Sequence, residues 1–87
     1  MAQVTDNESA NRFELRLDGR LGGWIDYDRQ DGTVALTHAE VVPELRNRGH
    51  GETMVREALA DLKRRDLQAR AICPFVQAYV RRHPDAI

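Results

Sequence analysis

The chain has 87 residues, of which 41% are hydrophobic and 31% charged, with a formal net charge of −1 and one cysteine. A chain of this length forms one domain, and folding hides only about 60% of the surface that the unfolded chain exposes. The charge balance argues against a nucleic-acid partner, and no apolar run approaches the roughly 20 residues of a membrane span. A single cysteine also excludes an internal disulfide.

The amino terminus, residues 1–11, is polar and lacks the basic and apolar regions of a signal peptide. We expect these residues to form a disordered tail, followed by a single domain over residues 12–87. The lack of a signal peptide and the lone cysteine together favour a cytoplasmic protein.

Three strands joined by tight turns are predicted in the first half of the chain. Residues 13–17 alternate between apolar and charged side chains, and the following Asp18-Gly19 is typical of a two-residue hairpin turn. A second strand is expected over residues 21–27, and Asp31-Gly32 marks another turn. A third and longer strand is predicted over residues 33–42.

An amphipathic helix is predicted after the third strand, because apolar residues recur at i, i+1, i+4, i+5 and i+8. These residues are Met54, Val55, Ala58, Leu59 and Leu62. A fourth strand over residues 67–72 can lie parallel to the third through a right-handed crossover, and residues 74–82 form a final helix. The expected fold class is α/β (α+β), in which an antiparallel β-meander is followed by β-α-β-α with a mixed sheet.

The segment between the third strand and the first helix is typical of a phosphate-binding loop. Its sequence is Val41-Val42-Pro43-Glu44-Leu45-Arg46-Asn47-Arg48-Gly49-His50-Gly51. Glycines let the backbone approach a ligand without a Cβ in the way, and the N–H groups that open a helix are unpaired donors. The pattern favours a pyrophosphate ligand, although the two glycines could also form only a tight turn. A P-loop and a Rossmann motif are excluded, because no Gly-Lys-Ser/Thr and no third Rossmann glycine follow.

The order strand, Val-Pro, Arg46-x-x-Gly49-x-Gly51, helix resembles the acetyl-CoA-binding motif of the GCN5-related N-acetyltransferase superfamily. Further on, Cys73-Pro74-Phe75-Val76, Tyr79 and His83-Pro84 resemble the signature of a small subfamily of stand-alone acetyltransferase-like proteins. The resemblance implies a truncated acetyltransferase fold, N-acetyltransferase activity, and acetyl-CoA as co-substrate without a metal.

In the superfamily that the chain resembles, the third and fourth strands separate and leave a slot for coenzyme A. The pantetheine arm then pairs with the backbone of a strand, at the carboxyl end where α/β sheets usually bind ligands. The residues expected to bind the coenzyme are Val41, Val42, Arg46, Asn47, Arg48, Gly49, His50, Gly51, Glu52, Cys73 and Phe75.

Two mechanisms remain open for the transfer. Cys73 precedes Pro74 and so is expected at a helix N-cap, where the thiolate is favoured and could accept the acetyl group, unless the residue is only packing. In the other mechanism an amine attacks directly, and the candidate bases are His38 and Glu40, which point to one face of the strand unless a bulge intervenes. Each could instead be a hydrogen-bonded histidine or an edge carboxylate without a catalytic role. Tyr79 matches in position the tyrosine that often serves the superfamily as general acid, and it also fits core packing.

The acceptor site is expected to be open, because Asp18-Gly19 replaces the substrate-covering helices usual in the superfamily. An open site suits a protein or peptide amine better than an enclosed metabolite, in a monomer or a weak homodimer. Neither nucleic acid nor a membrane is an expected partner. The alternative functions are a non-catalytic acyl-CoA-binding sensor and a protein-interaction module without coenzyme.

Overall fold

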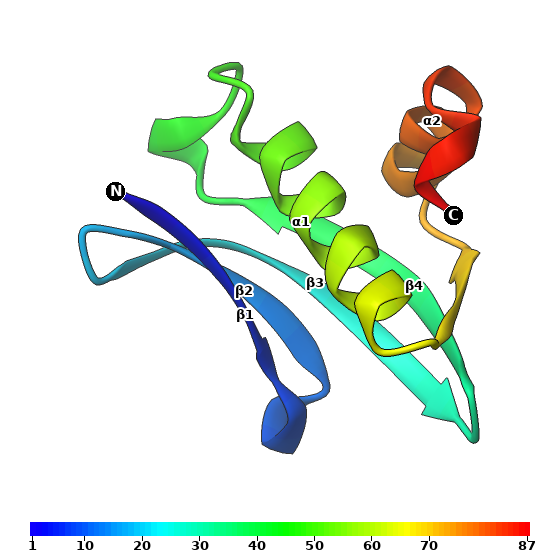
Figure 1. The fold of residues 1–87 in the computed structure, drawn as a ribbon. Coiled ribbons are helices and arrows are strands. Elements are labelled where there is room, and N and C mark those ends of the chain that lie inside the picture. Colours follow the sequence, from blue (N-terminus) through cyan, green and yellow to red (C-terminus); the bar gives the residue numbers. More distant parts are fainter.

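The computed structural model covers residues 1–87 and shows a five-stranded curved sheet with two α-helices (Figure 1). The strands are β1 (Ala2–Asn7), β2 (Arg12–Leu17), β3 (Arg20–Gln30), β4 (Thr33–Val41) and β5 (Gln68–Ala71). The helices are α1 (His50–Arg64) and α2 (Pro74–Arg82), and short 3-10 turns occur at Glu8–Ala10, Pro43–Leu45 and Pro84–Ala86. Neighbouring strands follow chain order, antiparallel from β1 to β4 and parallel between β4 and β5. The predicted mixed sheet is confirmed.

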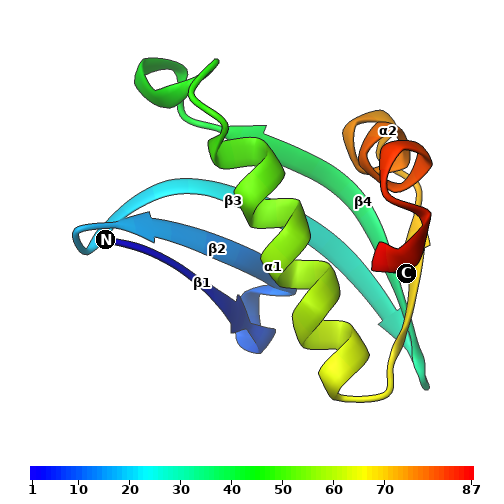
Figure 2. The same cartoon turned by 45° about the horizontal axis from the view of Figure 1, so that its top comes forward.

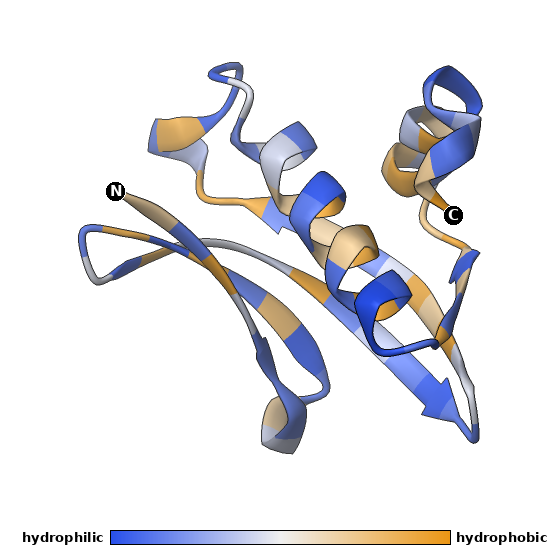
Figure 3. Cartoon of the chain, in the orientation of Figure 1, coloured by the Kyte–Doolittle hydropathy of each residue, from blue (hydrophilic) through white to orange (hydrophobic).

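Helix α1 lies across one face of the sheet, and α2 lies beside it next to β5 (Figures 1 and 2). All five apolar residues predicted for the buried side of α1 are buried. Hydrophobic and hydrophilic residues alternate along α1 and the strands, as Figure 3 shows. The core residues are Phe13, Leu15, Ile25, Tyr27, Val34, Leu36, Met54, Val55, Ala58, Leu59, Leu62, Cys73, Val76 and Tyr79. Neither helix has the length and apolar character needed to cross a bilayer.

The prediction of a disordered tail over residues 1–11 is wrong, because this segment contains strand β1. β1 pairs antiparallel with β2 along its whole length, and Val4 packs against the core. The Asp6 carboxylate accepts hydrogen bonds from the Tyr27 hydroxyl at 2.7 Å and from Arg65 at 2.9 Å. One apolar side chain and distant polar partners hold the strand, so no local hydrophobic pattern reveals it.

A β-bulge at Thr37 interrupts the pairing of β3 with β4. Asp26 pairs with His38 and the next residue, Tyr27, pairs with Leu36, which leaves Thr37 without a partner. The Thr37 hydroxyl donates a hydrogen bond to the Asp26 carbonyl at 3.1 Å. The extra residue reverses the alternation of side chains. Even-numbered residues of β4 face the core before Thr37, and odd-numbered residues face it afterwards.

The bulge determines where the predicted base residues lie. Ala39 and Val41 pack against the core, so His38 and Glu40 lie on the face of the sheet opposite α1. We name this the outer face of the sheet, and its side chains include Arg12, Glu14, Trp24, Asp26, Asp28, His38 and Glu40.

Strand β4 continues beyond its pairing with β5. The last paired residues are Leu36 and Ala71, after which the N–H groups of Ile72 and Cys73 donate to the Leu36 carbonyl at 3.1 and 2.9 Å. Residues 37–41 therefore have no neighbouring strand on that side. The strands predicted as the third and fourth are β4 and β5 of the structure. The unpaired edge of β4 corresponds to the slot expected between them.

Candidate functional site

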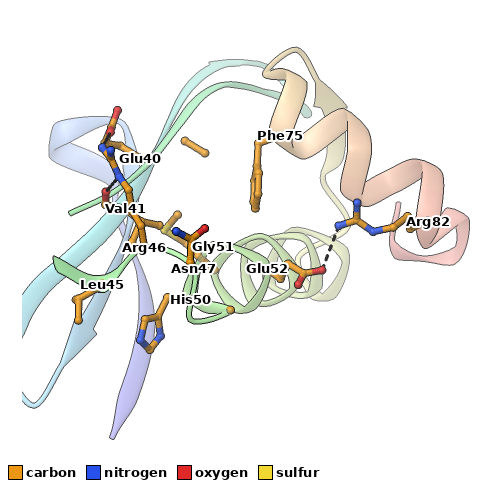
Figure 4. Close-up of a pocket in the computed structure, with 13 residues that line it drawn as sticks. Glu40, Val41, Leu45, Arg46, Asn47, His50, Gly51, Glu52, Phe75 and Arg82 are labelled. Carbon is orange, nitrogen blue, oxygen red and sulfur yellow. Dashed lines mark hydrogen bonds and ion pairs between the residues drawn. The ribbon is translucent and has the colours of Figure 1, made fainter. Parts of the chain in front are cut away.

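A cavity of about 610 Å³ opens between the unpaired edge of β4, the start of α1 and helix α2 (Figure 4). Its walls consist of Ala39, Glu40, Val41, Leu45, Arg46, Asn47, Gly49, His50, Gly51, Glu52, Met54, Phe75 and Arg82. Small-molecule sites usually occupy roughly 300 to 1,000 Å³ and combine apolar walls with a few polar groups. The cavity has both properties.

The start of α1 contributes free hydrogen-bond donors to the cavity. Gly49 is the N-cap and has a left-handed backbone, with φ of 82°. No side chain caps the helix, and the first backbone hydrogen bond is donated by Thr53 N–H to the Gly49 carbonyl at 3.1 Å. The N–H groups of residues 50–52 therefore have no acceptor within the helix, and together with the helix dipole they favour an anion.

Gly51 allows the ring of Phe75 to lie close to the first turn of α1. A Cβ at position 51 would be only 2.8 Å from the Phe75 ring. Phe75 is the second residue of α2, is 41% exposed and points across the cavity toward α1 (Figure 4). The ring gives the cavity an apolar wall that a ligand can contact.

Two arginines line the cavity, and each is paired with a carboxylate. Arg46 donates to Glu40 Oε2 at 2.7 Å and to the Val41 carbonyl at 2.9 Å. Arg82, in the last turn of α2, donates to Glu52 in the first turn of α1 at 3.1 Å. Both guanidinium groups are about half exposed, so an anion in the cavity can reach them.

His38 and Glu40 form a pair on the outer face, with His38 Nε2 lying 2.9 Å from Glu40 Oε1. This hydrogen bond, together with the charge of Arg46, lowers the pKa of Glu40 below its ordinary value. An ionised carboxylate can only accept hydrogen bonds, so His38 donates through Nε2 and a neutral ring keeps Nδ1 as an acceptor. Glu40 also lines the cavity, and it therefore connects His38 with that site.

Cys73 and Tyr79 lie in the core. Cys73 is the N-cap of α2 and precedes Pro74, as predicted, but it is only 5% exposed. Tyr79 is 6% exposed, and its ring packs against that of His83 with centroids 4.5 Å apart. Neither Cys73 nor Tyr79 lines the cavity.

A protein-family model described as GCN5-related N-acetyl-transferase matches residues 12–87. The chain belongs to the GCN5-related N-acetyltransferase family. Family membership confirms the enzyme class expected from the sequence, an N-acetyltransferase. Protein NATD1 of Xenopus tropicalis is 29% identical to this family member over 85 residues, which cover 94% of this chain and 77% of that protein.

Two solved structures share the fold of this GCN5-related chain. The ribosomal-protein-S18-alanine N-acetyltransferase from Escherichia coli has a TM-score of 0.59 at 18% identity, covering 64% of this chain and 36% of its own. Ard1 from Thermoplasma volcanium has a TM-score of 0.55 at 14% identity, covering 66% of this chain and 39% of its own. The aligned part thus makes up little more than a third of either structure.

The structure brings most of the predicted coenzyme-binding residues to one cavity. Those that line it are Val41, Arg46, Asn47, Gly49, His50, Gly51, Glu52 and Phe75. Val42, Arg48 and Cys73 lie outside its walls, as do His38 and Tyr79 among the predicted catalytic residues.

Sequence reasoning missed four residues of the cavity wall, namely Ala39, Leu45, Met54 and Arg82. Arg82 had a usable signal, because it follows Phe75 at i+7 and so lies on the same side of the predicted final helix. Ala39 had none, since its inward direction depends on the bulge at Thr37.

Proposed function

We propose that this protein transfers the acetyl group of acetyl-CoA directly to an amine of an acceptor that approaches the outer face. The observation that carries the proposal is the meeting of two features in one cavity. These are the free N–H groups of residues 50–52 and the unpaired edge of β4 at residues 37–41. A pyrophosphate suits the first feature, and an extended chain with amide groups, such as pantetheine, suits the second.

The other residues of the cavity also fit coenzyme A. Arg46 places a cation beside the loop that would hold the phosphates, and Phe75 and Met54 provide apolar surface. When bound, the coenzyme would supply an activated acetyl thioester. The chain itself would supply binding, orientation and a place for the proton that the acceptor amine must lose.

We propose that His38 is the base that accepts the proton of the acceptor amine. Its Nδ1 is free to accept while Nε2 donates to Glu40 at 2.9 Å. The Glu40 carboxylate would hold the imidazole in this tautomer and stabilise the imidazolium that forms, and Arg46 fixes Glu40 from the other side at 2.7 Å. Both His38 and Glu40 lie beside the unpaired edge of β4, so an amine could reach them from the outer face.

Transfer through Cys73 is the competing route. The thiol lies in the core and outside the cavity walls, so this route requires a rearrangement at the start of α2. His38 also lies outside the cavity walls, but its side chain is 57% exposed at the edge of β4 and is accessible to an acceptor amine without such a change. We therefore favour direct transfer.

Native and denaturing mass spectrometry with acetyl-CoA tests both the function and the route. We expect a non-covalent complex, acetylation of added peptide amines, and no acetyl group on the denatured protein, with the same results for Cys73→Ala. An acetyl group that survives denaturation in the native protein and is absent from Cys73→Ala would overturn direct transfer. A complex without transfer to any amine would indicate a sensor, and no complex at roughly millimolar coenzyme would contradict coenzyme binding altogether.

Gly49→Ala is expected to raise the Kd for coenzyme A about tenfold or more. A residue with a Cβ costs about 1–2 kcal/mol in the left-handed conformation, so the loop would relax and turn its N–H groups away from the cavity. Gly19→Ala is a matched control, because Gly19 also has a positive φ, 84° against 82°, and neither position has an atom within 4 Å of the added Cβ.

Calorimetric titration and thermal unfolding of the two variants check this prediction. Both variants are expected to lose similar stability, and only Gly49→Ala to lose affinity. If Gly49→Ala bound coenzyme A as tightly as Gly19→Ala, the glycines would serve only as a turn.

A further inference from the structure

Arg82 is a cation of the cavity wall that the proposed mechanism does not use. It stands in the last turn of α2, and its guanidinium donates to Glu52 Oε2 at 3.1 Å across the gap between the two helices (Figure 4). Both side chains line the cavity and are about half exposed. The pair therefore lies within reach of any anion that binds at the start of α1.

The position of Glu52 explains why the arginine is held there. A carboxylate in the first turn of a helix is favoured by the helix dipole, and it also attracts a guanidinium. An exposed pair of this kind contributes at most about 1 kcal/mol, so a phosphate can replace the carboxylate as the partner of Arg82 at little cost. Glu52 keeps the guanidinium close to the cavity without fixing it there.

The distribution of cations suggests which phosphate Arg82 contacts. Coenzyme A carries a pyrophosphate and a separate phosphate on the ribose 3′ position. The free N–H groups of residues 50–52 account for the pyrophosphate, with Arg46 on the β4 side of the same loop. Arg82 stands on the other wall, separated from Arg46 by the start of α1 (Figure 4).

The direction of the bound coenzyme leads to the same assignment. The start of α1 lies between the unpaired edge of β4 and helix α2. With the pantetheine arm along that edge and the pyrophosphate at the start of α1, a nucleotide that continues in the same direction extends toward α2. Arg82, in the last turn of α2, lines this side of the cavity (Figure 4). We propose that Arg82 binds the 3′-phosphate of the coenzyme and makes this site select coenzyme A over its 3′-dephospho form. This assignment rests on the proposed function.

The test is calorimetric titration with coenzyme A and with 3′-dephospho-coenzyme A. The native protein is expected to bind coenzyme A about tenfold more tightly, which is the lower range for a charge-assisted hydrogen bond. Arg82→Gln is expected to bind both ligands equally, with the affinity that the native protein has for the dephospho form. Arg81→Gln is the matched control, because Arg81 is an exposed arginine in the same turn without an ion pair, and it should retain the preference.

A further variant tests the role of Glu52. Glu52→Gln removes the competing carboxylate and is expected to tighten binding of coenzyme A more than binding of the dephospho form. Equal weakening of both ligands in Arg82→Gln would assign Arg82 to the pyrophosphate or to the fold and overturn the proposal. A native protein that binds both ligands equally would overturn it too, while the proposed function would stand. If neither ligand bound to the native protein, the proposed function would fall and this assignment with it.

Discussion

Replacing His38 by glutamine is expected to lower kcat for acetylation of a peptide amine about 100-fold or more, without changing the Kd for acetyl-CoA. General bases contribute roughly 10²- to 10⁴-fold, and glutamine keeps a side-chain amide near Glu40 but cannot take up a proton. The Kd is expected to stay constant because His38 lies outside the cavity walls. Steady-state kinetics at saturating acetyl-CoA measures kcat, and calorimetry measures the Kd.

The partner variant and a control make the assignment specific. Glu40→Gln is also expected to lower kcat, since it removes the charge that stabilises the imidazolium. Asp28→Asn removes a carboxylate from the same outer face, but Asp28 makes no side-chain hydrogen bond or ion pair with the site, and kcat should stay unchanged. If His38→Gln retained the full kcat, His38 would be excluded as the base, which would leave Glu40 as the candidate base for direct transfer and Cys73 as the acetyl acceptor of the covalent route.

The parts of this fold that the sequence predicts are those with local patterns. The buried side of α1 repeats at helical spacing, and Pro74 marks the start of α2 as expected. The turn at Asp18-Gly19 is also predicted from the residue pair itself, which is typical of tight hairpins. In the structure both residues have the positive φ that such a turn requires, 50° and 84°. Each of these signals lies within a few residues of the feature that it predicts.

The parts that the sequence does not predict depend on distant partners. Strand β1 is held by pairing with β2 and by the contact of Asp6 with Arg65, far along the chain. The bulge at Thr37 exists only relative to β3, and it decides that Glu40 faces away from α1. The pair Glu52–Arg82 joins two helices, so neither residue alone indicates a shared wall of the cavity.

Acidification is expected to remove up to about 3 kcal/mol of unfolding free energy through Glu14, a carboxylate of the outer face that is only 4% exposed. Glu14 accepts hydrogen bonds from Asn7 at 3.1 Å, Arg12 at 2.8 Å and Arg16 at 3.0 Å. The bond from Asn7 and then that from Arg12 lower the pKa of Glu14 from 4.5 to about 2. A shift of this size corresponds to about 3 kcal/mol at 1.36 kcal/mol per unit.

The sign of the effect follows from the direction of the shift. Because the folded state has the lower pKa, this contribution of Glu14 is complete above pH 4.5 and is lost as the pH falls toward 2. Denaturant unfolding of the native protein and Glu14→Gln across this range should give a difference of about 3 kcal/mol near neutrality that disappears near pH 2. Glu8→Gln removes an exposed carboxylate without a side-chain bond and should follow the native curve. A Glu14→Gln difference that stayed constant with pH would mean that Glu14 stabilises the sheet through packing and neutral hydrogen bonds, because only the charged form responds to protonation.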